Sequence, residues 1–282
     1  MVMQLDEFMA RRYFFRMNEM SGEVEYLDRS VIQFAYRPYT QKVRNSICLE
    51  AQKEGLNVWD KDIDRYVYSD QIPLFHPIDA FLANLPVWDG KSHIREMAAR
   101  VPNNNPLWSD CFYRWFLSMV AHWMQLDKEH GNSTTPLLVG DQGCGKSTYC
   151  LNLLPPSLRP FYTDSIDFGN KKEAELALHR YALINIDEFD SIGNSRQSFL
   201  KTPASKPEVN TRRAYKSSVQ ALKRYAGFVG TCNNMDLLSD PTGSRRFLCV
   251  EINGEIDRRH LSIMTSCMLR RSMRSVPVNG IG

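Results

Sequence analysis

The 282-residue sequence predicts an α/β fold with a mainly parallel sheet, and two observations lead to this prediction. Short apolar runs, typical of strands buried on both faces, recur at 134–139, 181–186 and 228–232. A glycine-rich loop follows the first run and opens a helix, the strand–loop–helix order of a P-loop. We therefore expect a P-loop NTPase core over residues 135–254, preceded by a helical segment and a small α+β region.

The composition, 43% hydrophobic and 24% charged, is that of an ordinary globular chain. No stretch approaches the roughly 18 uninterrupted apolar residues of a membrane helix. Charged residues from Asp6 to Arg16 interrupt the amino terminus, which argues against a signal peptide. The seven cysteines are an odd number without a C-x-x-C pair, which favours reduced thiols. We therefore expect a cytoplasmic protein with no membrane contact.

Residues 1–72 are expected to form a small accessory region. The spacing of Leu5, Phe8, Met9 and Tyr13 predicts a first helix, which Ser21-Gly22 breaks. Val24 and Tyr26 alternate with glutamates as in a half-buried strand, and a second helix runs from about Lys42 to Gly55. This region carries no recognisable catalytic constellation.

Residues 73–134 are expected to be a linker and a helical segment. Three prolines and the turn Trp88-Asp89-Gly90 mark the boundary. One continuous apolar face of a long helix then follows, made by Trp108, Phe112, Trp115, Phe116, Met119, Val120 and Trp123. Such a stripe can stack on nucleic-acid bases, but core packing is the better interpretation.

The glycine-rich loop has the pattern G-x-x-x-x-G-K-S. It consists of Gly140, Asp141, Gln142, Gly143, Cys144, Gly145, Lys146, Ser147 and Thr148. Glycines let successive N–H groups curl around a phosphate, and the following helix adds its positive end. Lys146 is expected to reach the β- and γ-phosphates of ATP, and Ser147 to bind Mg²⁺. A glycine-rich turn with an incidental lysine is the alternative. Cys144 is interpreted as a small loop residue rather than a redox sensor.

Polar residues end the next two strands. A parallel strand beside the P-loop strand would place Asp187 near Mg²⁺ and Glu188 near the γ-phosphate, where a carboxylate can activate water. Asn233 ends the third strand and is a candidate sensor of the γ-phosphate. Arg245 and Arg246 lie on a later turn and suit an arginine finger, although they can also be surface arginines paired with carboxylates.

Five segments resemble, in the same order, the motifs of the virulence-associated protein E family, in its Bacteroidetes-type branch. They are Leu85–Gly90, Gln142–Thr148, Asn185–Asp190, Gly230–Asn233 and Asp240–Phe247. The resemblance extends to about residue 257. It implies a P-loop ATPase on an AAA+-like core, related to superfamily 3 helicases and to phage or plasmid primase-helicases. It further implies an oligomeric ring with ATP hydrolysis at subunit interfaces, acting on DNA in the replication of mobile elements.

A basic stretch precedes the sensor strand. Residues 201–224 contain seven Lys and Arg against Glu208 alone, a net charge of +6. In superfamily 3-like rings this segment supplies pore loops, so we expect contact with single-stranded or forked DNA. The best candidates are Arg212, Arg213, Tyr215 and Lys216. A solvated surface loop is the alternative.

Residues 255–282 form an atypical tail without clean helical periodicity. Back-translation of 263–270 in a shifted frame gives a helix like that of the family, so we expect a frameshift near residue 258. The main prediction is an Mg²⁺-dependent ring ATPase that moves or opens DNA. The alternatives are a small-molecule kinase and a truncated, ATP-binding but non-hydrolysing DNA-binding or assembly subunit.

Overall fold

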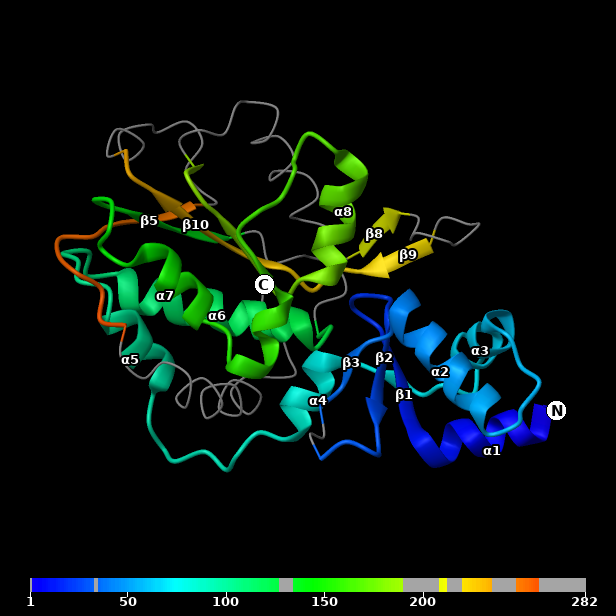
Figure 1. The fold of residues 1–282 in the computed structure, drawn as a ribbon. Helices are drawn as coiled ribbons and strands as arrows, with labels where there is room; N and C mark the ends of the chain where they lie inside the picture. Colours follow the sequence, from blue (N-terminus) through cyan, green and yellow to red (C-terminus); the bar gives the residue numbers. More distant parts are fainter. Residues whose placement is uncertain are drawn as a thin grey trace. The chain divides into compact units, whose positions relative to one another are not determined.

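The computed structural model describes residues 2–32, 35–126, 134–189, 208–211, 220–234 and 247–258. The chain divides into two compact units, Met1–Ala80 and Phe81–Gly282 (Figure 1). Within the described ranges, no helix is both long enough and apolar enough to cross a bilayer. The expected boundaries near residues 72 and 134 remain predictions.

The N-terminal unit consists of helices around a small mixed sheet. Its elements are α1 (Val2–Arg12), β1 (Tyr13–Asn18), β2 (Val24–Asp28), β3 (Arg37–Pro38), α2 (Gln41–Lys53), α3 (Asp60–Val67) and β4 (Leu74–Phe75), and α4 (Pro77–Ala83) spans the boundary between the units. The strand order is β3-β2-β1-β4, with β1 antiparallel to β2 and parallel to β4. The strand at Val24 and the helix ending before Gly55 are confirmed, and Gly55 has a φ of 86° just after the C-cap of α2.

The first helix is shorter than the sequence pattern predicts. It ends at Arg12, and Tyr13 begins β1 instead of continuing the helical face. Tyr13 and Phe15 are buried while Phe14 is exposed, the alternation of a strand. Three successive aromatic residues favour a pleated, half-buried surface, and packing on that surface outweighs the helical spacing of Tyr13.

The second unit is built on a five-stranded, wholly parallel sheet, so the predicted α/β class is confirmed. Its elements are α5 (His93–Ala99), α6 (Trp108–Trp123), β5 (Thr135–Val139), α7 (Lys146–Asn152), η1 (Pro156–Phe161), β6 (Tyr162–Thr163), α8 (Lys171–Arg180), β7 (Leu183–Ile186), β8 (Glu208–Thr211), β9 (Gln220–Lys223), β10 (Gly227–Cys232) and β11 (Phe247–Glu251). The order of the sheet is β11-β5-β10-β7-β6, and β8 pairs with β9 as a separate antiparallel pair.

The two faces of the parallel sheet pack against different elements. Leu178 of α8 and residues of β8 and β9 join one core cluster with Leu137 and Ile184. Figure 1 shows α6 and α7 on the other side of β5 and β10 from α8. The aromatic face of α6 is buried, with Phe112 and Phe116 fully inaccessible, and the indole of Trp123 donates to Ala182 O at 3.1 Å. Core packing is thus the role of this stripe.

One expectation about the sheet is wrong. The strand that ends before Asp187, β7, does not lie beside the P-loop strand β5, because β10 is inserted between them. All three strands are parallel, so their carboxyl ends still meet at one edge. Insertion of β10 places the residues that follow it, including Asn233, between the P-loop and Asp187.

Candidate functional site

The P-loop leaves β5 and turns tightly into α7. Gly143 and Gly145 have φ values of 88° and 99°, a region that L side chains rarely adopt. Gly140 is confined in another way, because a Cβ there would lie 3.0 Å from Ile252 Cβ. These glycines therefore allow a backbone path that other residues would resist, and the loop ends at the amino terminus of α7.

Lys146 has a buried side chain whose ammonium is fully hydrogen-bonded. Its Nζ donates to Gly140 O at 2.6 Å, to Asp141 O at 2.8 Å and to Asn233 Oδ1 at 2.9 Å. An ammonium has three protons, so these three oxygens satisfy it. The lysine thus links the P-loop to the end of β10, and it must exchange some of these acceptors to bind a phosphate.

The acidic pair follows β7 directly. Both Asp187 and Glu188 are exposed, and Thr231 Oγ1 of β10 donates a hydrogen bond to Asp187 Oδ1. Glu188 has a φ of 49°, unusual for a non-glycine residue. The next residue, Phe189, is buried and its ring packs edge-on against Phe247 at 4.9 Å. This packing holds the turn on which Glu188 is presented to solvent.

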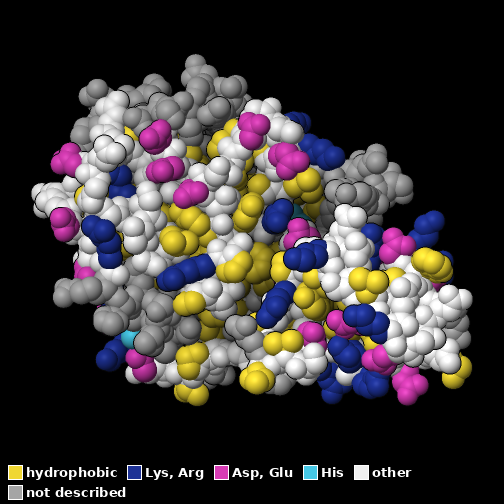
Figure 2. Space-filling model, in the orientation of Figure 1, with side chains coloured by type: hydrophobic (Ala, Val, Ile, Leu, Met, Phe, Trp, Pro, Cys, Tyr) yellow, Lys and Arg dark blue, Asp and Glu magenta, His cyan; other side chains and the backbone are white. Residues whose placement is uncertain are grey.

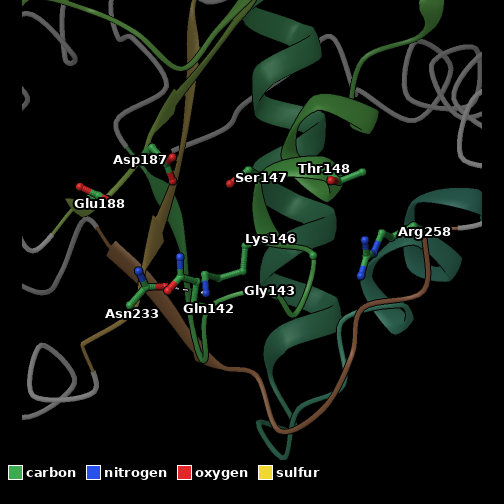
Figure 3. Close-up of a pocket in the computed structure, with 10 residues that line it drawn as sticks. Gln142, Gly143, Lys146, Ser147, Thr148, Asp187, Glu188, Asn233 and Arg258 are labelled. Atoms are coloured by element: carbon green, nitrogen blue, oxygen red, sulfur yellow. Dashed lines mark hydrogen bonds between the residues drawn. The ribbon is translucent and has the colours of Figure 1, made fainter.

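Residues of the P-loop, the acidic pair and Asn233 line one pocket of about 330 Å³. Figure 3 shows Asp187 and Ser147 on facing sides of it, with Asn233 beside Lys146. Its lining consists of Gln142, Gly143, Gly145, Lys146, Ser147, Thr148, Asp187, Glu188, Asn233 and Arg258. Of the predicted site residues, Gly140, Asp141 and Cys144 belong to the same loop without lining the pocket. The structure thus brings the described phosphate, metal and catalytic candidates together.

The oxygen donors in this pocket fit Mg²⁺. Ser147 offers a hydroxyl and Asp187 a carboxylate, the hard ligands that this cation prefers. Within the described residues, no group of three or more His, Cys, Asp and Glu can hold a metal ion. A site with one or two protein ligands suits Mg²⁺, which keeps several waters and binds substrate phosphates.

The chain beyond β11 runs along the outside of the P-loop. Ile252 N donates to Val139 O at 2.7 Å and Ile256 N donates to Cys144 O at 3.0 Å. Arg258 follows, and its side chain lies close to Gly145. A Cβ added at Gly145 would be 2.8 Å from Arg258 Nε. Figure 3 shows Arg258 on the other side of the P-loop from Glu188. Arg258 could not be identified from the sequence, since no periodicity or motif marks it.

Several predicted residues lie outside the described residues. These are the arginine-finger candidates Arg245 and Arg246 and the DNA candidates Arg212, Arg213, Tyr215 and Lys216. The strands on either side of the DNA candidates are described, and Thr211 of β8 pairs with Gln220 of β9. Residues 212–219 therefore connect two antiparallel strands.

Arg224, which is part of the basic stretch, does not face solvent. Its side chain is fully buried, and its Nε and Nη2 donate to Ala226 O at 3.1 and 2.9 Å. Burial lowers the pKa of Arg224 to about 9, because a charged guanidinium is disfavoured away from water. The net charge of +6 counted for residues 201–224 therefore overstates the charge that faces solvent.

Comparisons with known proteins identify one family. The family model for the virulence-associated protein E-like domain matches residues 82–267. No curated protein matches the chain. Two solved apo structures of the C-terminal region of NrS-1 are similar in fold, with TM-scores of 0.53 and 0.54 at 10% and 11% identity. The alignments cover 95% and 99% of this chain, and 67% and 70% of those chains.

Proposed function

The chain belongs to the virulence-associated protein E-like domain family, and on this premise we propose that it is an Mg²⁺-dependent ATPase. We propose further that it acts as an AAA+-like ring that moves or opens DNA in the replication of a mobile element. One observation carries the proposal. The pocket gathers a P-loop lysine and serine, an acidic pair and a strand-end asparagine from the ends of three parallel strands.

The strand order supports a P-loop core with a sensor residue at its centre. Counted along the chain, the five parallel strands are ordered 5-1-4-3-2, so the strand before Asn233 lies between the P-loop strand and the acidic strand. This arrangement lets Asn233 contact Lys146 while Asp187 and Glu188 stand on its other side. From this position Asn233 can sense a γ-phosphate that Lys146 binds, which is the role that we propose for it.

Each residue then has a defined part in phosphoryl transfer. The P-loop amides and Lys146 hold the phosphates, and Mg²⁺ at Ser147 and Asp187 would neutralise charge on the phosphate oxygens. Glu188 orients water and accepts its proton, because its carboxylate is presented to solvent in the pocket. Arg245 or Arg246 of a neighbouring subunit would complete the site, which is why the proposal includes a ring.

DNA contact is assigned to residues 212–219 rather than to the N-terminal unit. Residues 1–80 contain ten Lys and Arg against thirteen Asp and Glu, a net charge of −3. On the face shown in Figure 2, basic and acidic side chains of this unit are interspersed. Arg212, Arg213 and Lys216 instead belong to the basic stretch of the sequence that connects β8 to β9, and we assign them to a DNA phosphate backbone.

The test is ATP hydrolysis at low salt, with and without single-stranded DNA. Glu188→Gln keeps the shape of the side chain but removes the base, so we expect at least a 100-fold loss of kcat with nucleotide still bound. Lys146→Ala is expected to abolish nucleotide binding, whereas Lys172→Ala, an exposed lysine on α8, is the matched control. Arg246→Ala is expected to lose turnover but not binding.

The outcomes separate the alternatives. DNA-stimulated turnover that both Lys146→Ala and Arg246→Ala lose supports the ring ATPase. Nucleotide binding without turnover in the wild-type chain would contradict it, and would favour a non-hydrolysing DNA-binding or assembly subunit.

A further inference from the structure

Thr231 is a buried residue whose hydroxyl contacts Asp187, one of the acidic residues that line the pocket. It belongs to β10, is 1% exposed, and its Oγ1 donates to Asp187 Oδ1. The register explains the contact. Gly230 pairs with Ile186, so the next residue of each strand, Thr231 and Asp187, are neighbours across the sheet.

This hydrogen bond restricts the carboxylate that we assign to the metal. A carboxylate has two oxygens, and an exposed aspartate on a turn is free to rotate among several orientations. When Thr231 holds Oδ1, the side chain is kept in one orientation and Oδ2 remains available to a cation. Hydrogen bonds of this kind orient the ligands of metal sites, and their loss typically costs about 10- to 100-fold in metal affinity.

The same strand also holds the other half of the pocket. Asn233 lies two residues beyond Thr231, just past the end of β10. It accepts from Lys146 while Thr231 donates to Asp187. The central strand β10 thus fixes the phosphate-binding lysine on one side and the metal-binding carboxylate on the other.

We infer that Thr231 is a positioning residue, which orients Asp187 for Mg²⁺ without contacting nucleotide or metal. The inference rests on the proposed function, because it assigns a role to Thr231 only if Asp187 binds the metal. It predicts a defect in metal affinity that is separate from nucleotide affinity.

The experiment measures Mn²⁺ binding to the full chain by electron paramagnetic resonance in the presence of ADP. Thr231→Val preserves the branched shape and removes the hydroxyl, so Mn²⁺ affinity is expected to fall about 10-fold or more. Nucleotide affinity in EDTA is expected to change less than about twofold. Thr231→Ser restores the donor and is expected to restore Mn²⁺ affinity to within about twofold of the wild type.

Two controls keep the inference open to refutation. Thr135→Val makes the same change in the neighbouring strand β5, at the end away from the pocket, and should leave Mn²⁺ affinity unchanged. In an Asp187→Ala background, Thr231→Val should have no further effect, because the two residues act as one unit. If Thr231→Val does not fold, Thr231→Ala takes its place in both measurements.

The failures are distinguishable. If the wild-type chain binds no nucleotide, the proposed function is wrong. If it binds nucleotide and Mn²⁺ but Thr231→Val retains full Mn²⁺ affinity, or loses nucleotide affinity in EDTA to the same extent, only the positioning role is overturned.

Discussion

In the P-loop, the backbone conformation of a single residue, Gly143, affects both stability and phosphate binding. Gly143 has a φ of 88°. Apart from Gly143 and its chain neighbours, no heavy atom of the described residues lies within 4 Å of the position that a Cβ would take, so space does not require glycine there. The backbone conformation does, because the left-handed region costs L residues about 1–2 kcal/mol. Gly143 therefore matters for the path of the loop rather than for packing.

Gly143→Ala is expected to lower the free energy of unfolding by about 1 kcal/mol and to weaken nucleotide binding at least 10-fold. The binding loss follows because a loop that relaxes from this φ no longer aims its N–H groups at the phosphates. Urea unfolding and nucleotide titration measure the two effects.

Gly55→Ala is the matched control, since Gly55 has a φ of 86° and equally open surroundings but lies in the N-terminal unit. It should lose similar stability with no change in nucleotide affinity. Equal nucleotide affinity in both variants would mean that the loop conformation is not what binds phosphate.

Arg224→Ala is expected to lower the free energy of unfolding by about 2–4 kcal/mol, because it removes a large buried side chain and both donors to Ala226 O. At a temperature where the variant is folded, its affinity for single-stranded DNA should match the wild type. Arg212→Ala should show the opposite pattern, with stability kept and DNA affinity reduced. If the folded Arg224→Ala variant has a lower affinity for single-stranded DNA than the wild type, Arg224 contributes to DNA binding after all.

The role of a residue could be predicted from the sequence where a local sequence motif defines it. It could not be predicted where the role depends on contacts with a neighbouring strand. Lys146 and Ser147 follow from spacing alone. Thr231 and Arg224 do not, because their roles depend on which strands are adjacent and which side chains are buried. The insertion of β10 between β5 and β7 is such a case, and it changes the neighbours of every residue at that edge.

At the scale of elements, α6 shows how strong periodicity makes a reliable prediction. Its apolar residues recur on one face over four turns, and the helix spans Trp108–Trp123 as that face requires. The weaker pattern around Tyr13 failed because four residues cannot distinguish a helix from a helix followed by a strand. The length and regularity of the apolar pattern therefore determine how well the bounds of a helix could be predicted.

Phe116→Ala is expected to lower the free energy of unfolding of the second unit by about 3–5 kcal/mol, because Phe116 is fully buried in the aromatic core of α6. Leu107→Ala, at the exposed N-cap of the same helix, should change it by less than about 0.5 kcal/mol. Urea unfolding compares the two. Similar losses would indicate that α6 is not packed as a core helix.

For the whole molecule, the division into two units predicts where nucleotide binding resides. The described residues that line the pocket all fall between Gln142 and Arg258, within the second unit. The N-terminal unit has a hydrophobic core of its own, formed by residues from Leu5 to Ile72. None of the described residues of the first unit lines the pocket.

A fragment of residues 77–282, which keeps α4 whole, is accordingly expected to bind nucleotide with a Kd within about threefold of the full chain. It retains the P-loop, the acidic pair, Asn233 and the basic stretch, so DNA should also stimulate its ATPase activity. Isothermal titration with nucleotide checks the first point, and Lys146→Ala in the same fragment checks that binding occurs at this pocket. Cooperative unfolding of the fragment serves as the control for folding, because a fragment that does not fold would show no cooperative transition. If the folded fragment binds nucleotide more than about 10-fold more weakly than the full chain, the N-terminal unit supports the nucleotide site.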